Sequence, residues 1–407
     1  MKASDVLRAS RPRVRERPLR RRMQSAYAWI DERAGTTELL HKGLYEAVPK
    51  RGGWAYTLGS ATLVLILLQI FTGIFLLLDF TPSVESDWNS LDYLRSSDPF
   101  GNWVRGLHLW GAYTLILVIG LHMVRTFVSA SYKRPRELNW VSGAVLFFLV
   151  LGLAITGAML PLDQAGYWTT VVVTNIVHYL PLIGDGLREL WRGGDFVGPI
   201  TLTRTFAIHI WVLPFLLLVF IGSHLYLLRR HGEFGAWINY DTTSDNPDRE
   251  MGERIRHAEP PYPTRRIDRR YAAPAETVGF FPDQLLKDTI VSAGLVIMIF
   301  VMGLISGAPL DAPYNSATLS YVPTPEWFFL PLDQFLVLTP HNPLIAVGVF
   351  LIIGGGALAL VLLPFLDRSR DRRPTRRPEV MLPVLLVVFS VIFLAVLGVN
   401  RLYALTP

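Results

Sequence analysis

Four histidines lie in two apolar stretches of the chain, with two histidines in each stretch. His108 and His122 lie fourteen positions apart, and His209 and His224 lie fifteen positions apart. Because an α-helix turns by about 100° per residue, either spacing places both imidazoles on one broad face of a helix, roughly 21 Å apart along its axis. That distance covers most of a hydrocarbon core about 30 Å thick. Two such helices packed face to face would form two histidine pairs, one near each membrane surface.

Paired imidazoles at two depths of a membrane suit two haem groups that carry electrons across it. A single intramembrane histidine is explained equally well by a hydrogen bond to a neighbouring helix. Four histidines at helical spacing favour haem ligation instead. Two pairs of glycines repeat the fourteen-residue spacing in other apolar stretches, Gly59 with Gly73 and Gly143 with Gly157. Glycines at this spacing can make room for two flat macrocycles, although close helix packing also uses them.

Two arginines accompany the first pair of histidines. Arg105 precedes His108 by about one helical turn, and Arg125 follows His122 by three residues. Each guanidinium is placed to neutralise a haem propionate near its own membrane surface. The alternative is an arginine that only extends its charge into the membrane interface.

Seven apolar stretches of the chain are long enough to cross a membrane. They lie near residues 54–78, 106–128, 140–160, 205–228, 287–308, 343–366 and 381–403. The 407-residue chain is 51% hydrophobic and its mean hydropathy is +0.34, which is too apolar for an ordinary soluble domain. The first stretch begins too far along the chain, and is too long, for a signal peptide. We therefore expect an all-α integral membrane protein with seven transmembrane helices.

The connections between these stretches alternate in their content of basic residues. Residues 1–53 carry thirteen Lys and Arg, and the connections 129–138, 229–286 and 367–380 carry three, nine and six. The connections 79–104 and 309–341 carry one and none. By the positive-inside rule, the N-terminus is expected inside and the C-terminus outside.

Composition also narrows the classes of function. The basic N-terminal segment favours contact with anionic lipid headgroups, and nucleic-acid binding is not expected because no groove-reading module is visible. The chain contains no cysteine. Disulfides, thiolate-bound iron–sulfur clusters and thioether-linked haem are therefore excluded within it.

The order of the stretches predicts four parts of the chain. They are a basic cytoplasmic segment (1–53), a four-helix di-haem unit (54–232), a cytoplasmic connector (233–282) and a three-helix C-terminal unit (283–407). Between the third and fourth spans, the stretch that contains Tyr167 and Trp168 predicts a short helix along the membrane interface, where both aromatic rings would lie in the aromatic belt.

A second group of residues lies in the loop between the fifth and sixth spans. Its sequence is Pro325-Glu326-Trp327-Phe328. A carboxylate among apolar and aromatic neighbours near a membrane surface should have a raised pKa, which suits a group that takes up and passes on a proton. Quinol oxidation needs such a group, because each electron that leaves is accompanied by proton release. An interfacial or helix-capping Glu326 is an equally good explanation from physical chemistry alone.

These residues together resemble cytochrome b of the cytochrome bc complexes, from about residue 45 to residue 403. The four histidines match the haem ligands of that family. Pro325-Glu326-Trp327-Phe328 resembles its Pro-Glu-Trp-Tyr quinol-site motif, with Phe328 in place of the tyrosine. The segment from Gly157 to Trp168 resembles the end of the third helix of the family and the start of its outer surface helix.

The resemblance also indicates a branch of the family. The fifteen-residue spacing, the seven spans and the segment Lys133–Trp140 resemble a fusion of the photosynthetic four-helix cytochrome with three-helix subunit IV. Thr57 stands where that branch carries a haem-attaching cysteine, so the extra covalent haem should be missing. The segment Phe280–Asp288 instead resembles the mitochondrial inner quinone site, whose Lys-Asp pair corresponds to Lys287 and Asp288 here.

The resemblance implies the catalytic subunit of a bacterial quinol:cytochrome c oxidoreductase, a multi-pass protein of the cytoplasmic membrane. Two non-covalent haem b groups would be bound, with His108 and His209 ligating the outer iron and His122 and His224 the inner iron. Quinol would be oxidised at an outer site between residues 160–175 and Glu326. One electron would pass to a Rieske iron–sulfur protein and then a c-type cytochrome.

The other electron would cross the membrane through both haems to a quinone at an inner site. Arg229, Lys287 and Asp288 would line this inner site, and the two quinone reactions together would build a proton gradient. The family resemblance further implies a homodimer.

Two other hypotheses about the function remain open from the sequence. A di-haem membrane anchor of a dehydrogenase or hydrogenase would also pair four histidines, but such anchors usually have four or five helices and no second unit. A haem-free transporter that uses its histidines as proton relays would be colourless.

Overall fold

The computed structural model describes residues 18–37, 44, 47–231, 277–315, 321–322, 324–339, 343–369 and 371–405. The chain forms two compact units. One comprises Met1–Val48 with Ala258–Leu285, and the other comprises Pro49–His257 with Leu286–Pro407. Most of the expected cytoplasmic connector, 233–282, lies outside the described residues.

The smaller unit contains one helix that the sequence analysis did not predict. Helix α1 spans Pro18–Ala34, within the segment 1–53 that was expected only to be basic. Its apolar residues recur at helical spacing, at Leu19, Met23, Tyr27 and Ile30. The unit also holds β2 (Thr277–Gly279), which pairs with β1 (Ala47–Pro49), and the short helical turn η5 (Phe280–Gln284).

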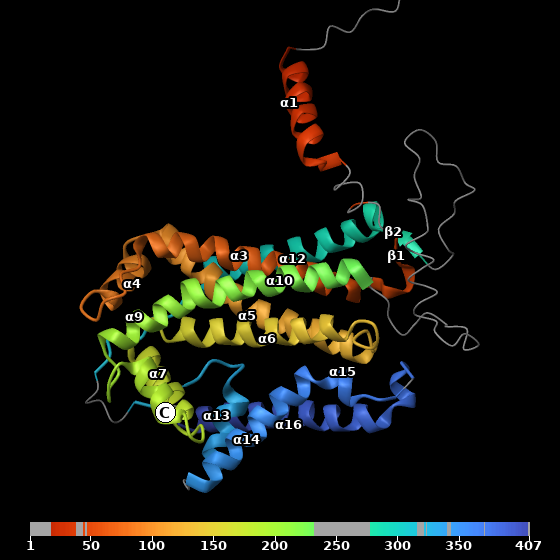
Figure 1. The fold of residues 1–407 in the computed structure, drawn as a ribbon. Coiled ribbons are helices and arrows are strands. Elements are labelled where there is room, and N and C mark those ends of the chain that lie inside the picture. Colours follow the sequence, from red (N-terminus) through yellow and green to blue (C-terminus); the bar gives the residue numbers. More distant parts are fainter. Residues whose placement is uncertain are drawn as a thin grey trace, which may run out of the picture. The chain divides into compact units, whose positions relative to one another are not determined.

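Four long helical segments form a bundle in the larger unit. They are α3 (Thr57–Asp79), α5 (Pro99–Val128), α6 (Glu137–Ala158) and the continuous run α9, η3 and α10 (Pro199–Ala207, Ile208–Val212 and Leu213–His231). Helix α3 packs mainly on α5, and α10 packs mainly on α6 (Figure 1). Ahead of α3, the turn η2 (Lys50–Tyr56) contains Gly53 at a positive φ of 57°, a conformation that favours glycine.

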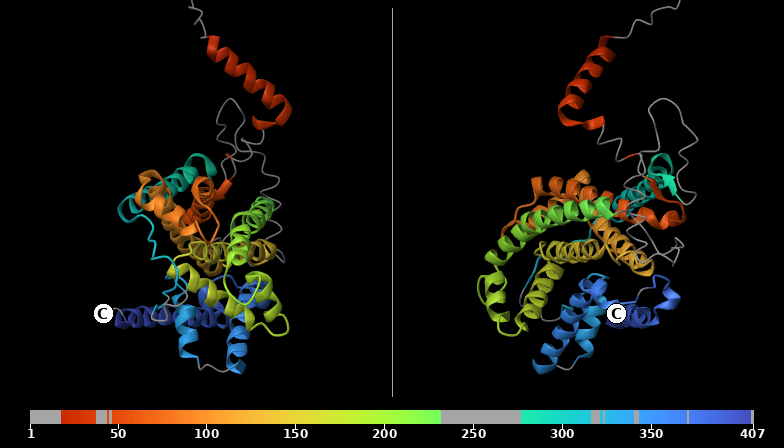
Figure 2. Two further views of the ribbon diagram at one scale, coloured as in Figure 1. Left: turned by 90° about the vertical axis from the view of Figure 1, so that its left-hand side faces the viewer. Right: turned by 45° about the vertical axis from the view of Figure 1, so that its right-hand side comes forward.

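The fourth span contains a local irregularity at one of the histidines. Residues Ile208–Val212 form a π-helical turn that includes His209. In Figure 2 the run from Pro199 to His231, coloured yellow-green to green, follows one continuous curve through this turn. Single π turns inside α-helices occur frequently at functional sites.

Apolar side chains lie both in the core of the bundle and on its outer surface. Leu65, Leu115 and Val150 are buried in the core, whereas Phe71 and Phe215 are more than half exposed. Among the described residues, six helices are long and apolar enough to cross a membrane. The described strands are limited to two of three residues each. These findings confirm a predominantly helical, multi-pass membrane protein. The count of seven spans stays a prediction, because the sixth expected span contributes a shorter apolar helix, Leu351–Val361.

Three shorter helices connect the long ones. They are α4 (Asp87–Ser96), α7 (Gln164–His178) and α8 (Gly184–Arg192). The predicted helix between the third and fourth spans is present as α7, and Asp163 caps it by accepting a hydrogen bond from the Gly166 N–H at 2.8 Å. The placement of Tyr167 and Trp168 in an aromatic belt stays a prediction. Tyr167 is buried and stacks on Tyr314 with ring centroids 4.8 Å apart.

The C-terminal part begins with a helix that packs closely on α5. Helix α12 spans Leu285–Ser306, and an added Cβ on Gly106 of α5 would lie 3.0 Å from the Cα of Gly303. Trp110 of α5 donates a hydrogen bond to the carbonyl of Gly307 at 3.1 Å. The helices that follow are α13 (Leu330–Leu338), α14 (Pro343–Val361), α15 (Leu363–Leu366), η6 (Pro374–Arg376) and α16 (Pro378–Leu405).

A buried polar cluster joins the α5–α6 connection to the segment between α15 and α16. The Arg377 side chain is fully buried and donates hydrogen bonds to the Tyr132 hydroxyl and to the carbonyl of Phe127, both at 2.6 Å. Tyr132 in turn donates to Asp367, and the Lys133 ammonium lies 3.1 Å from the same carboxylate. Burial alone would raise the pKa of Asp367, but the hydrogen bonds from Tyr132 and Lys133 and the Lys133 charge hold it below its usual range.

Removal of the buried guanidinium should destabilise the protein. We expect Arg377→Met to lower the free energy of unfolding by about 3–5 kcal/mol, because Asp367 is left as a buried charge with a weakened partner set. Thermal unfolding of the detergent-purified protein, followed by tryptophan fluorescence, measures the effect. Arg376→Met is the matched control, because the neighbouring Arg376 is exposed and lies 3.9 Å from Asp371. Equal losses in both variants would contradict a structural role for the cluster.

Candidate functional site

The four predicted histidines meet in two pairs between α5 and the α9–α10 run. His108 of α5 and His209 of η3 have ring centroids 6.4 Å apart, with their planes at 72°. His122 of α5 and His224 of α10 lie close enough for their charges to interact. The fourteen-residue spacing of the two histidines of α5 separates the pairs by roughly 21 Å.

Three of the four imidazoles each contact a hydroxyl group from α3 or α6. In each contact the hydroxyl oxygen lies within hydrogen-bond distance of Nδ1 of the ring. The contacts are Thr72 with His108 at 2.9 Å, Thr156 with His209 at 3.0 Å and Ser142 with His224 at 3.0 Å. Helix α3 supplies Thr72, and α6 supplies the other two hydroxyls.

These hydroxyls fix which nitrogen of each ring carries the proton. Thr72 donates its own proton to the carbonyl of Leu68, one turn back on its helix, at 2.8 Å. Thr156 and Ser142 likewise donate to carbonyls of their own helix, at 2.8 and 2.9 Å. Each hydroxyl oxygen must therefore accept from Nδ1–H of the imidazole. The second ring nitrogen, Nε2, then keeps a lone pair that is available to a metal ion.

The four glycines of the sequence analysis each lie against one of the histidines. An added Cβ would lie 3.2 Å from His122 at Gly59, 3.4 Å from His108 at Gly73, 3.1 Å from His224 at Gly143 and 3.0 Å from His209 at Gly157. Any side chain at these positions would crowd the imidazole ring. The glycines therefore keep space open at both histidine pairs.

The residues at the His122 pair also include polar atoms with no partner. Nδ1 of His122 and Nη2 of Arg125 are buried and have no hydrogen-bond partner in the described part of the chain. The Arg125 guanidinium lies over the ring of Tyr56, 3.6 Å from its centroid. The residue before Gly59 is Leu58, so no hydroxyl is present there to accept from His122. Arg105, at the other pair, donates to the carbonyls of Ala308 and Pro309 at 3.0 and 2.6 Å.

The geometry of these residues fits a bis-histidine haem. An imidazole nitrogen binds a transition metal at about 2 Å. Two imidazoles that shared one metal ion would therefore have ring centroids roughly 6 Å apart, close to the 6.4 Å between His108 and His209. The open glycine positions and the unpaired Arg125 nitrogen fit a flat macrocycle with anionic propionates. Thr57, at which the family resemblance predicts no covalent haem, is buried and donates to the carbonyl of Trp54 at 2.7 Å.

Glu326 lies in an aromatic environment beside α5. Tyr113 of α5 donates a hydrogen bond from its hydroxyl to Oε2 of Glu326. The Tyr113 ring is also in edge contact with Trp327 and Phe328, with centroids 6.4 and 6.1 Å apart. Burial raises the pKa of Glu326, and the hydrogen bond from Tyr113 partly offsets this. Tyr113 follows His108 by five residues, which corresponds to roughly 7.5 Å along α5.

Two buried acidic residues lie at the end of the bundle where α4 and α7 begin. The sequence analysis did not predict a role for either residue. Asp87 is fully buried and accepts a hydrogen bond from the Leu162 N–H at 2.6 Å. Burial, together with repulsion from Asp163, raises the pKa of Asp87 to about 7, although Leu162 and Arg105 oppose the shift. Asp163 accepts from the Asp311 N–H at 3.0 Å. These partners are distant in sequence, so no local pattern indicated either carboxylate.

The three residues expected at the inner quinone site have different environments. Asp288 is buried and accepts a hydrogen bond at 2.8 Å from Ser60, the residue that follows Gly59. Lys287 is partly exposed, and Arg229 is exposed in the last turn of α10. The contact with Ser60 places Asp288 near the His122 pair.

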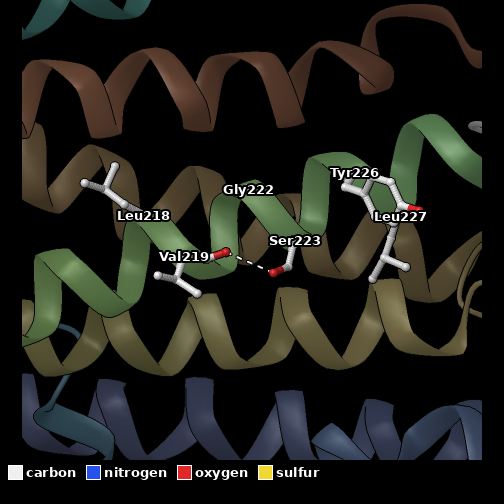
Figure 3. Close-up of a pocket in the computed structure, with 6 residues that line it drawn as sticks. All are labelled: Leu218, Val219, Gly222, Ser223, Tyr226 and Leu227. Atoms are coloured by element: carbon white, nitrogen blue, oxygen red, sulfur yellow. Dashed lines mark hydrogen bonds between the residues drawn. The ribbon is translucent and has the colours of Figure 1, made fainter.

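An apolar groove on α10 has no chemistry of its own. Its lining residues are Leu218, Val219, Gly222, Ser223, Tyr226 and Leu227 (Figure 3). The hydrogen bond drawn there runs from the Ser223 hydroxyl to the Val219 carbonyl of the same helix, at 3.0 Å. The groove therefore offers no group for catalysis, and the histidine pairs are the candidate site.

The raised pKa of Asp87 predicts a pH-dependent cost to stability. A carboxyl with a folded-state pKa of about 7 and an ordinary pKa of 3.8 makes the fold less stable as the pH rises between these values. Asp87→Asn should therefore raise the thermal midpoint at pH 8 by an amount corresponding to a few kcal/mol, at about 1.4 kcal/mol per pKa unit, and much less at pH 5.

Thermal unfolding of the purified protein at both pH values tests this prediction. Asp92→Asn is the control, because Asp92 lies on the same helix but is partly exposed and paired with Arg95 at 2.7 Å. A gain in the Asp87 variant that is equal at pH 5 and pH 8 would show that ionisation of this carboxyl is not the cause.

Comparisons with known proteins agree with this geometry. Residues 45–232 match the family "Cytochrome b/b6/petB", and residues 313–406 match "Cytochrome b(C-terminal)/b6/petD". Cytochrome b6 of Synechococcus sp. (strain JA-3-3Ab) is 37% identical over 213 residues, which cover 52% of this chain and 99% of that protein. Cytochrome b6 of Prochlorococcus marinus (strain MIT 9515) is 37% identical over 211 residues, which cover 52% and 97%.

A solved structure covers nearly the whole chain. It is described as "Hyperthermophilic respiratory Complex III", with a TM-score of 0.76 and 27% identity over 91% of each chain. The matched parts of the chain are the histidine-bearing bundle and the segment that contains Glu326. The chain therefore belongs to the cytochrome b/b6 family, as a fusion of a cytochrome b6-like part with a subunit IV-like part.

Proposed function

We propose that this cytochrome b is the di-haem, quinol-oxidising subunit of a quinol:cytochrome c oxidoreductase. The observation that carries the proposal is the pairing of His108 with His209 at a bis-histidine distance, on helices that also bring His122 and His224 together. When bound, two haem b groups would supply one-electron carriers at two depths of the membrane. The alternative of a dehydrogenase or hydrogenase anchor leaves the C-terminal match at residues 313–406 without a role.

The residues around each histidine pair would hold the haems without a covalent bond. The four histidines would ligate the irons, and Thr72, Ser142 and Thr156 would keep Nε2 of their imidazoles unprotonated. Gly59, Gly73, Gly143 and Gly157 would leave room for the macrocycles. Arg125 would offer its unpaired nitrogen to a propionate, and Arg105 would add a second positive charge at the other pair.

Glu326 would take up a proton from quinol at the site that it forms with residues 160–175. Its partly buried position raises its pKa, which brings the carboxyl closer to the pH at which it both accepts and releases protons. The electron partners of this reaction would be a Rieske iron–sulfur protein and then a c-type cytochrome. The complex III neighbour supports such an assembly.

The distribution of basic residues supports an orientation in the membrane. With residues 1–53 and the connection 367–380 inside, the His108 pair and Glu326 lie near the outer surface. The His122 pair then lies near the cytoplasm of a bacterium, together with Lys287, Asp288 and Arg229, which would line a quinone-reducing site. Seven spans and a homodimer complete the proposal.

Loss of one ligand should remove one haem. We expect His108→Leu to reduce the pyridine haemochrome count from two b haems per chain to one, and to abolish quinol oxidation, because an imidazole ligand of the outer iron is lost. His178→Leu is the control, since His178 lies on α7 and pairs with Asp185 at 2.6 Å. Retention of both haems by the His108 variant would refute the ligand assignment.

The role of Glu326 is tested separately from haem binding. Glu326→Gln should slow quinol oxidation on the order of 100-fold while both haems are retained, because the amide cannot accept the proton. Steady-state turnover of the purified complex, with a haem spectrum of the same sample, measures both properties. Glu379→Gln, which changes an exposed carboxylate at the start of α16, should have no effect. Full activity of the Glu326 variant would rule out this carboxylate as the proton acceptor.

A further inference from the structure

The quinol-site motif lacks one hydroxyl in this chain. The motif it resembles ends in tyrosine, and Phe328 stands at that position. A tyrosine from a different element lies directly beside it, because the rings of Tyr113 and Phe328 have centroids 6.1 Å apart at 68°. The hydroxyl of Tyr113 donates to the carboxylate of Glu326, two residues before Phe328.

The surroundings of Tyr113 hold its ring in one place. Trp110, one turn earlier on α5, contacts it edge-on with centroids 5.7 Å apart, and Trp327 does so at 6.4 Å. Together with Phe328, these rings enclose Tyr113 with aromatic side chains from both α5 and the Glu326 segment. Edge-to-face contacts of this kind are specific in geometry. The phenol is therefore directed at Glu326 by packing as well as by its hydrogen bond.

We infer that Tyr113 supplies to Glu326, from α5, the hydroxyl that the family motif carries at the position of Phe328. Tyr113 is thereby a positioning residue for the proton acceptor of quinol oxidation. The inference rests on the proposed role of Glu326, and it assigns a function to a residue 213 positions away in the sequence.

The chemistry follows from the direction of the hydrogen bond. A phenol O–H that donates to a carboxylate stabilises the ionised form, whereas burial favours the neutral form. Among the described residues, burial and Tyr113 are the two influences on the pKa of Glu326. When a proton moves from the quinol hydroxyl to the Glu326 carboxylate, Tyr113 keeps its own proton and its hydrogen bond to the carboxyl weakens. Tyr113 therefore favours the proton-accepting state before the reaction and holds the protonated state less firmly after it.

The test is the pH dependence of quinol oxidation by the assembled complex. Quinol oxidation should slow at low pH as Glu326 becomes protonated, and loss of the Tyr113 hydroxyl should raise the pKa of Glu326 further. We expect Tyr113→Phe to move this acid limb upward by about one pH unit, so that the rate on the limb falls roughly tenfold. The rate at alkaline pH should change by less than about twofold, and both haems should be retained.

Two further variants separate this inference from a general packing effect. Thr114→Val is the matched control, because it removes a hydroxyl from the next position of α5. Within the described part of the chain, that hydroxyl bonds to the Trp110 carbonyl of its own helix, at 2.8 Å. Its acid limb should not move. In a Glu326→Gln background, Tyr113→Phe should add no further change, because the group on which it acts is already gone.

A swap of the hydroxyl between the two positions keeps the inference testable even if Tyr113→Phe disturbs assembly. Tyr113→Phe combined with Phe328→Tyr conserves both rings and the number of hydroxyls, and it should restore the acid limb of the unmodified protein. A displaced limb in this swap, or an unmoved limb in Tyr113→Phe while Glu326→Gln is slow, would overturn the inference. Full activity of Glu326→Gln would instead overturn the proposed role of Glu326 itself.

Discussion

The packing of this structure depends on the partners of its intramembrane imidazoles. A polar ring in an apolar interior needs a partner for each of its nitrogens. Helix α5 and the α9–α10 run supply the rings, and α3 and α6 supply the partners. A hydroxyl at Thr72, Ser142 or Thr156 accepts from Nδ1, and the glycine that directly follows it leaves space beside the ring. One dipeptide thus satisfies the imidazole and keeps the neighbouring volume open. The packing of α3 on α5 and of α6 on α10 follows from this arrangement.

Helix α5 would link the proposed proton and electron chemistry of the protein. It carries His108 and His122, the Glu326 partner Tyr113, and the arginines Arg105 and Arg125 within 30 residues. Its backbone approaches α12 closely through glycine, since Gly106 faces Gly303. This backbone approach brings the segment after α12 against α5, so Glu326 meets Tyr113 although the two lie in parts of the chain that match different family models. The buried Arg377 cluster joins the same two parts at the α5–α6 connection.

The features that were predictable from the sequence are those with a local period. Apolar runs, the spacing of four histidines and the matching spacing of four glycines all follow from helical geometry, and the structure places each glycine against one histidine. Helices α1 and α4 were missed because they are not continuous apolar runs. Asp87, Tyr113 and Arg377 were missed for a different reason. Their partners are 75, 213 and 245 residues away, and a contact of that separation leaves no periodic signal in the chain.

The two histidine pairs are alike in their predicted ligands but unlike in their surroundings. Both imidazoles of the His108 pair bond to hydroxyls, whereas at the other pair only His224 does so, because Leu58 precedes Gly59 where the other three glycines follow Thr or Ser. The same pair has the buried Arg125 nitrogen without a partner and Asp288 nearby through Ser60. Hydrogen bonds to a ligand and charges around it tune a metal centre as much as ligand identity does. The same predicted ligands therefore do not make two equal histidine pairs, and the difference arises from single residues on α3 and α5.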